Sequence, residues 1–304
     1  MNRYMPLVLT GLLFLVPRTI KADGFLYNGV AFAGISFPGA SLTAPSALNN
    51  NGAIVGVAYI GNAPIDFLDQ NGTFTTITGP GGSFAALTGI NDAGQIVGFV
   101  STFESFVETN GQFTLLAVPG SQGGEPVGIN DKGVVVGNFD TTASNGSAIP
   151  HGFLYSNGTY KIVNAPGAFE TALLGINNLG QVVGSDVIQT TTGTGFIGQD
   201  FIYFNGLFSD FSIPCPGAQI TGINDLEQIV GTCGSSGFIF DLSTGSFTLV
   251  NVPGAVSTMP TDINDAGQIV GTDTTPEPSS LLLISTGLVG LACALRRKWL
   301  KDSI

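Results

Sequence analysis

Carboxylate and amide side chains recur along this sequence in short turns of the form Asn-Asp-x-Gly. The Asp residues of these turns are Asp92, Asp131, Asp225 and Asp265; in the turn of Asp225, Glu227 replaces the Gly. Oxygen-rich loops suit Ca²⁺, so these four residues are weak candidates for a calcium site, although the longer alternation of Asp and Asn in an EF-type loop is absent. The simpler interpretation is a turn in which Asn and Asp accept hydrogen bonds from their own backbone and Gly adopts a positive φ. We therefore predict no metal site and no cofactor, with Ca²⁺ as the weaker alternative.

Other catalytic chemistry has little support in the sequence. The chain has one His, His151, and it lacks the Gly-x-Ser-x-Gly and His-Glu-x-x-His motifs of hydrolases and metalloproteases. Glycoside hydrolysis needs two carboxylates at a defined separation, and the Asp residues of the turns occupy equivalent positions, which indicates a structural role. The acids that break this pattern are Glu104, Glu108, Glu125, Glu170 and Asp210. No pair among them stands out, so we predict no catalytic residue.

The turns belong to a repeat that occurs six times. Its signature, Ile90–Gly98, returns at residues 129–137, 176–184, 223–231 and 263–271, with a looser first copy at 48–56. The Asn residues of the signature stand at positions 49, 91, 130, 177, 224 and 264. Each unit also opens with a Phe (25, 67, 106, 153, 201, 238) and contains a Pro-Gly pair (Pro at 38, 80, 119, 166, 216, 253). Three landmarks in a fixed order identify a repeat architecture.

Each unit can be divided into four short strands, as the second unit illustrates. Strands are expected at residues 66–69, 73–78, 86–91 and 95–99, with Asn71-Gly72 as a tight hairpin turn between the first two. Four antiparallel strands in roughly 40–45 residues is the size of a propeller blade. We therefore predict an all-β protein with a six-bladed β-propeller at residues 23–273, in which the repeated Phe fills the space between blades. The alternative is an open β-solenoid or linear array.

The cysteines suggest an oxidising compartment. Cys215 and Cys233 both lie in the fifth unit, where the Pro-to-Asn spacing is shorter than in the other units. In a meander both would lie toward the same end of the sheet, so we predict a disulfide between them. The third, Cys293, lies near the C-terminus.

The two ends of the chain read as targeting segments. Residues 1–22 combine Arg3, an apolar run and a small residue at Ala22, which is typical of a secretory signal peptide; a retained anchor is the alternative. Near the C-terminus, Pro276-Glu277-Pro278 precedes an apolar stretch, residues 279–295, which is just long enough to span a membrane. The basic residues that follow it, Arg296 and Arg297, would stay cytoplasmic and leave the body of the chain outside.

The C-terminal segment, residues 274–304, closely resembles the PEP-CTERM sorting signal of Gram-negative bacteria. The matching residues are Pro276, Glu277, Pro278, Arg296 and Arg297, together with the apolar helix between them. The resemblance implies recognition and processing by a membrane-embedded exosortase, with delivery to the envelope, cell surface or exterior. Before processing, the chain would be held in the membrane through this helix. The family is associated with exopolysaccharide production and biofilm.

The repeat itself resembles the HAF family of bacterial extracellular repeats. The nearest copy is the fourth, with His151-Gly152-Phe153-Leu154-Tyr155 followed by Ile176–Gly184. This resemblance implies an extracellular repeat domain and no established reaction.

Charge narrows the set of partners. The 304 residues are 43% hydrophobic and carry a formal charge of −12. Between Asp23 and Thr275 there are 19 acidic residues and two basic ones, Lys132 and Lys161. A body this acidic has no surface for nucleic acid phosphates. We predict a non-enzymatic binding module for exopolysaccharide or envelope proteins. The alternatives are an extracellular glycan hydrolase or lyase and a purely structural matrix protein.

Overall fold

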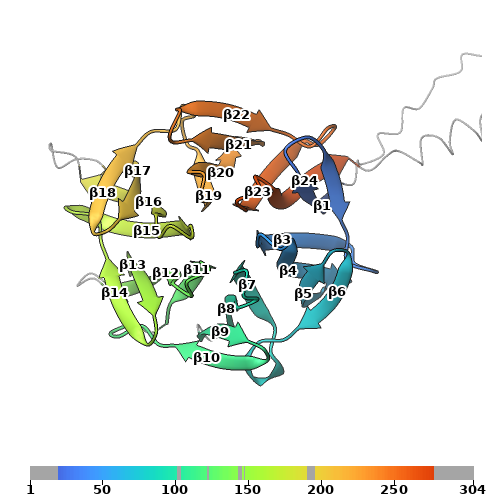
Figure 1. The fold of residues 1–304 in the computed structure, drawn as a ribbon, viewed down its shortest axis with the longest axis horizontal. Coiled ribbons are helices and arrows are strands. Elements are labelled where there is room, and N and C mark those ends of the chain that lie inside the picture. The colour runs from blue at the N-terminus through green and yellow to red at the C-terminus, as the bar shows by residue number, and fades with distance from the viewer. Residues whose placement is uncertain are drawn as a thin grey trace, which may run out of the picture. The chain divides into compact units, whose positions relative to one another are not determined.

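The repeats fold into radial sheets that close into a ring. A computed structural model of the chain describes residues 20–276, apart from residues 101–103, 122, 143–145, 147 and 190–195. These residues form six four-stranded antiparallel sheets around a central axis, as Figure 1 shows. The fold is a six-bladed β-propeller, as the repeat predicts, and the alternative of an open solenoid is wrong.

Five blades are built from four consecutive strands. They contain β3 (Leu42–Leu48), β4 (Ala53–Ile60), β5 (Ala63–Gln70) and β6 (Thr73–Ile77); β7 (Ala85–Ile90), β8 (Ile96–Val100), β9 (Ser105–Thr109) and β10 (Gln112–Leu116); β11 (Glu125–Ile129), β12 (Val135–Thr142), β13 (Ala148–Ser156) and β14 (Thr159–Val163); β15 (Ala168–Ile176), β16 (Val182–Gln189), β17 (Phe196–Phe204) and β18 (Leu207–Phe211); and β19 (Gln219–Ile223), β20 (Gln228–Cys233), β21 (Ser236–Asp241) and β22 (Ser246–Val250). A single 3₁₀ turn, Pro80–Gly82, precedes β7 in the described part of the chain.

The sixth blade joins the two ends of the propeller. Its strand order is β2-β1-β24-β23, so that β1 (Ile20–Tyr27) and β2 (Phe32–Ile35) form its outer half. The inner half consists of β23 (Ser257–Ile263) and β24 (Ile269–Pro276). Strands from the first and last repeats therefore pair within one sheet, β1 with β24, and this pairing closes the ring.

The blades are offset by half a repeat from the units read in the sequence, which corrects the expectation that one unit forms one blade. The signature of one unit supplies the two inner strands, and the Phe and hairpin of the next unit supply the two outer strands. β1 begins at Ile20 and β24 ends at Pro276, three residues beyond the expected bounds on each side. This offset places the first and last described strands, β1 and β24, in one sheet, which a unit-per-blade arrangement would not require.

The offset also explains why each unit ends in Gly and the next opens with Phe. The two residues are cross-strand partners within one blade, for example Gly98 with Phe106 and Gly184 with Phe201. All six Phe side chains are at most 1% exposed. A Cβ on Gly184 would lie 2.6 Å from the carbonyl oxygen of Ala172 and would meet the Phe201 ring. The Gly therefore leaves the space in which the buried ring packs.

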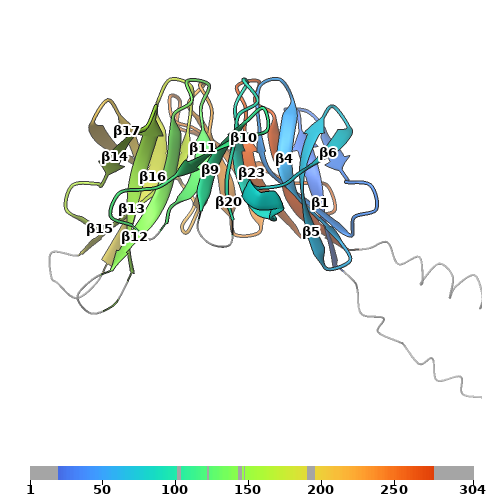
Figure 2. The ribbon, with the colours of Figure 1, turned by 90° about the horizontal axis from the view of Figure 1, so that it is seen from below.

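The strands run between two faces of the propeller, which Figure 2 shows from the side. One face, called the Asn face below, carries the Asn-Asp turns and the hairpin turns such as Asn71-Gly72. Asn71 has φ 55° and Gly72 φ 85°, as the tight hairpin requires. The opposite face carries the Pro-Gly connections between blades and is called the Pro-Gly face. No helix in the described residues is long and apolar enough to cross a membrane; the expected span 279–295 lies outside those residues.

Candidate functional site

The axis of the propeller is lined by the innermost strand of every blade. Each of these strands contains a β-bulge just before the Asn of the signature, between Leu87 and Gly89 in β7, for example. The channel holds a cavity of about 80 Å³. Sites for small organic ligands usually measure roughly 300–1,000 Å³, so the channel suits a few water molecules and not a sugar.

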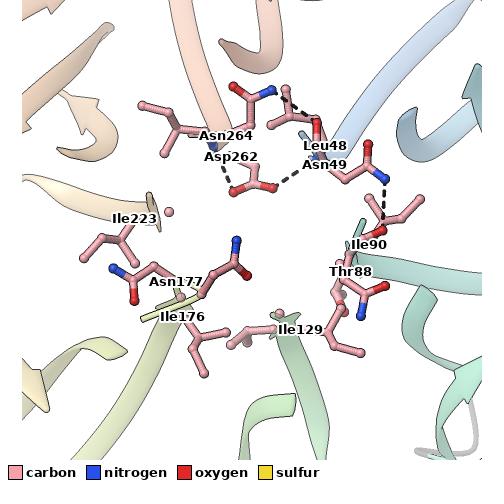
Figure 3. Close-up of a pocket in the computed structure, with 18 of the residues that line it drawn as sticks. Leu48, Asn49, Thr88, Ile90, Ile129, Ile176, Asn177, Ile223, Asp262 and Asn264 are labelled. Atoms are coloured by element: carbon pink, nitrogen blue, oxygen red, sulfur yellow. Dashed lines mark hydrogen bonds between the residues drawn. The ribbon is translucent and has the colours of Figure 1, made fainter. Parts of the chain in front are cut away.

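The Asn residues of the signature form a closed ring of hydrogen bonds around this channel. The Nδ2 group of each Asn donates to the backbone carbonyl of the corresponding Asn in the next blade. The six bonds are Asn49 to Asn91 (2.9 Å), Asn91 to Asn130 (3.0 Å), Asn130 to Asn177 (3.1 Å), Asn177 to Asn224 (3.0 Å), Asn224 to Asn264 (3.0 Å) and Asn264 to Asn49 (3.2 Å). All six residues are buried, and the last bond closes the ring, as Figure 3 shows in part.

A second closed ring lies one residue further along the chain. Here the backbone N–H of each residue donates to the side-chain Oδ1 of the corresponding residue in the next blade. The bonds run from Asn50 to Asp92 (2.7 Å), Asp92 to Asp131 (2.8 Å), Asp131 to Asn178 (2.8 Å), Asn178 to Asp225 (2.7 Å), Asp225 to Asp265 (2.8 Å) and Asp265 to Asn50 (2.8 Å).

This second ring revises the interpretation of the Asn-Asp turns. The Asn accepts from its own turn, as expected, since Asn91 Oδ1 accepts from Gln95 N at 2.9 Å. The Asp instead accepts from the neighbouring blade. The structure thus brings together Asp92, Asp131, Asp225 and Asp265, and among the described residues no group of three or more His, Cys, Asp or Glu is arranged to hold a metal ion. The ring can fasten blades to one another.

The carboxylates of this ring lie close enough to affect one another. Burial raises the pKa of the Asp131 carboxyl, and the negative charges of Asp92 and Asp265 raise it further. The hydrogen bond from the backbone N–H of Asp92 lowers this pKa in part. Burial and the charge of Asp265 likewise raise the pKa of Asp225. Asn50 moderates this repulsion because its Nδ2 donates to Asp265 Oδ2 at 2.8 Å and to Asp92 Oδ2 at 3.2 Å.

Asp262 is a titratable residue of the channel that the sequence analysis missed. It occupies the position that is Gly89, Gly128, Gly175 or Gly222 in four of the other blades and Ala47 in the fifth, and its carboxylate enters the channel (Figure 3). Its Oδ2 accepts from Leu48 N at 3.1 Å and its Oδ1 from Ile263 N at 2.9 Å. Burial raises the pKa of Asp262 to about 7, although the two N–H groups lower it. An alignment of the six units by their Asn would have shown an Asp where four units have Gly.

The asymmetric acids named from the sequence are spread over three blades. Glu104 and Glu108 belong to the β7–β10 blade, Glu125 to β11, and Glu170 and Asp210 to the β15–β18 blade. His151 is held in β13 by contacts with Thr141 Oγ1 (2.8 Å) and Asn164 Oδ1 (3.1 Å). Of these acids, Glu108 lines the largest groove described below.

A groove of about 710 Å³ opens on the Asn face between the β3–β6 and β7–β10 blades. Gln70 and Leu68 of β5 line one wall, and Glu108 of β9 and Phe113 of β10 line the other. Phe113 and Glu108 are cross-strand partners, so both side chains project from the same face of their sheet. The floor includes Asn51 and Asp92. No motif in the sequence indicates this groove, because its walls come from two units.

A second groove of about 420 Å³ lies on the other side of the same blade, between β3–β6 and the closing blade. Its lining includes Asp69, which lies between Leu68 and Gln70 of the first groove along β5, and the cross-strand partner of Asp69, Phe74. Ala33 and Ser36 of the closing blade form the other side. Asn71, at the tip of the β5–β6 hairpin, lines both grooves.

The disulfide expected from the sequence is present in the structure. Cys215, in the connection between β18 and β19, is bonded to Cys233 at the end of β20. The bridge ties the Pro-Gly connection of this blade to its second strand, where the shorter fifth unit leaves less chain.

The C-terminal segment matches a protein-family model. Residues 274–298 match the PEP-CTERM protein-sorting motif. The chain therefore carries a signal for exosortase, which implies processing by that enzyme and export to the surface of a Gram-negative bacterium. The motif contains all five residues expected from the sequence, of which Glu277, Pro278, Arg296 and Arg297 lie outside the described residues.

Several solved structures are similar to this chain at low sequence identity. The β-propeller domain of the Trilobed protease from Pyrococcus furiosus is 10% identical over 77% of this chain and 76% of that chain, with a TM-score of 0.47. A putative TolB from Agrobacterium tumefaciens is 10% identical over 86% and 92%, with a TM-score of 0.41. Penicillium chrysogenum alpha-L-arabinanase, complexed with arabinobiose, is 11% identical over 77% and 93%, with a TM-score of 0.41. None of the curated proteins compared with the chain matches it.

Proposed function

We propose that this exported propeller is a non-enzymatic binding protein of the cell surface and that its ligand is extracellular polysaccharide. The observation that carries the proposal is the 710 Å³ groove on the Asn face, which lies within the size range of ligand sites. The groove lies between two blades and is open to solvent, so a polysaccharide longer than the groove can extend beyond it at both ends. The resemblance of the unit to HAF repeats fits an extracellular role.

The chemistry of the groove supports a sugar ligand. Exposed amide groups of Asn51, Gln70 and Asn110 can donate to and accept from hydroxyl groups. Phe113 is 37% exposed, which leaves part of its ring free to pack against the C–H groups of a sugar ring. A surface that mixes planar polar groups with an aromatic ring complements a molecule that is polar at its edges and apolar on its ring faces.

The arrangement of the carboxylates supports binding without cleavage. The Asp residues of the channel accept hydrogen bonds from neighbouring blades and line a cavity of about 80 Å³, which is too small for a sugar. In the groove, Glu108 Oε1 accepts from the N–H of Gly111, a bond that commits one oxygen to the hairpin. A hydrolase would need two carboxylates flanking the scissile bond. The second carboxylate of the groove, Asp92, accepts at both oxygens from Asn50.

Retention on immobilised exopolysaccharide from the producing cells tests the proposal. The exported protein, purified from those cells, should be retained without releasing new sugar ends. The variant Gln70→Trp places a large side chain in the groove and should lose at least tenfold in retention. Gln112→Trp is the matched control, because Gln112 is exposed but pairs with Thr109, on the face of the hairpin opposite Phe113.

Each outcome of this experiment supports either the proposed binding function or one of its alternatives. Retention that Gln112→Trp preserves and Gln70→Trp removes supports the groove as the binding site. Release of sugar ends would make the protein a glycan hydrolase or lyase. Absence of retention would direct the search to envelope proteins or to a structural role in the matrix.

A further inference from the structure

The grooves beside β3–β6 are lined by acidic residues. Asp92 and Glu108 line the larger groove and Asp69 lines the smaller one, and among the residues that the structure describes no Lys, Arg or His lines either groove. The surrounding body has only Lys132 and Lys161 against 19 acidic residues between Asp23 and Thr275. An anionic polymer entering the grooves would meet repulsion from both the lining and the whole molecule, whereas a cationic one would be attracted.

The two grooves open side by side at the Asn face of the propeller, one on each side of the β3–β6 sheet. Gln70 and Ala53 project into the first groove, and Asp69 and Phe74 project into the second. Asn71, at the exposed tip of the hairpin between them, lines both. A polymer that crosses this tip contacts both grooves, while a ligand of one or two sugars contacts one.

From these observations we infer that the ligand of this surface is a glycan polymer that carries free amino groups, held across the β5–β6 hairpin with its ammonium groups beside Glu108. The inference rests on the proposed function and adds the charge class and the length of the ligand. Glu108 is suited to this role because it is half-buried in the wall of the larger groove and projects beside Phe113. The ring of Phe113 then packs against the sugar while the carboxylate bonds the amine.

Three glycans of equal length distinguish the charge classes: a glucosamine oligomer with free amines, its fully acetylated neutral form, and a uronate oligomer. Affinity is measured by calorimetry with the exported protein at low and at high salt. We expect the amine form to bind at least tenfold tighter than the neutral form at low salt, with the difference shrinking as salt rises. The uronate should bind most weakly.

Variants separate the role of Glu108 from general charge. Glu108→Gln should remove most of the tenfold preference for the amine form and leave the affinity for the neutral form within about twofold. Glu104→Gln, which removes the same charge from an exposed position away from the grooves, should keep the preference. Longer amine oligomers should gain affinity in the native protein. That gain should be absent in Ala33→Trp, which fills the smaller groove.

Outcomes for this inference and for the proposed function are distinct. Equal affinity for the amine and neutral forms, or tightest binding of the uronate, overturns the inference and leaves glycan binding in place. A loss of preference in Glu104→Gln equal to that in Glu108→Gln also overturns it. Binding of none of the three, together with no retention on the native polysaccharide, overturns the proposed function itself.

Discussion

Asp262 makes the stability of the propeller depend on pH. Burial among the inner strands raises its pKa from 3.8 to about 7. Between these two values the folded chain keeps the proton and the unfolded chain releases it, so the free energy of unfolding falls as the pH rises. Above about pH 7 both states are ionised at this residue and its contribution is constant. A shift of one pKa unit corresponds to 1.36 kcal/mol, so from pH 5 to pH 8 Asp262 lowers stability by about 3 kcal/mol.

The substitution Asp262→Asn isolates this effect. An amide keeps an oxygen acceptor for one of the two N–H groups and does not titrate. The free energy of unfolding, from urea titrations at about pH 5 and about pH 8, should fall less with pH in the variant than in the native protein, by about 3 kcal/mol. Asp66, whose pKa burial raises to about 6, acts in the same direction in both proteins and cancels in the comparison.

The matched control is Asp140→Asn, which removes a carboxylate from an exposed position in β12. It should leave the difference between the two pH values unchanged to within about 0.5 kcal/mol, as for an ordinary surface substitution. The same pH dependence in Asp262→Asn as in the native protein would refute the reasoning. So would a native protein that gains stability from pH 5 to pH 8.

Three further predictions concern the packing of the blades. Gly184→Ala should lower the free energy of unfolding by about 1–3 kcal/mol, because its Cβ would collide with a backbone carbonyl and a buried ring; Gly198→Ala, in the same blade with its nearest neighbour at 3.7 Å, should change it by less than about 1 kcal/mol in urea titrations. Asn177→Ala should cost about 2–4 kcal/mol in the same assay, because it breaks the ring of amides and leaves buried partners unpaired; a change below about 0.5 kcal/mol would argue against the ring. The non-reduced protein should show no reactive thiol at Cys215 or Cys233, and reduction should lower stability by about 3 kcal/mol, as a loop of this length predicts.

The architecture of the propeller was readable in the sequence because its landmarks have local causes. The Asn-Gly pairs adopt positive φ in hairpins, and the Phe and Gly landmarks pack against one another, so both leave a periodic trace. The closure of the ring was not readable. Closure depends on whether the strands of a unit pair within that unit or with strands of the neighbouring unit. The repeat has the same period in both cases, so the period does not distinguish them.

The candidate site was less predictable than the fold. The role of the Asp92 carboxylate in holding the neighbouring blade depends on a contact with Asn50 N, 42 residues away, which a turn motif does not encode. The groove is formed by Gln70 and Glu108 from separate units, and neither residue belongs to a landmark of the repeat. Asp262 was hidden for a different reason, because it stands directly before the signature 263–271, at a position where the other units have only Gly or Ala.

Hydrogen exchange of the exported protein, with and without the producing cell's polysaccharide, tests whether the groove is the glycan site. Bound polysaccharide should slow exchange in the hairpin segments 70–73 and 110–113, on the Asn face beside the groove. Exchange in the Pro-Gly connections on the opposite face should stay unchanged. Protection confined to the Pro-Gly face, or no protection at polysaccharide concentrations that saturate retention, would contradict the assignment of the groove as the glycan site.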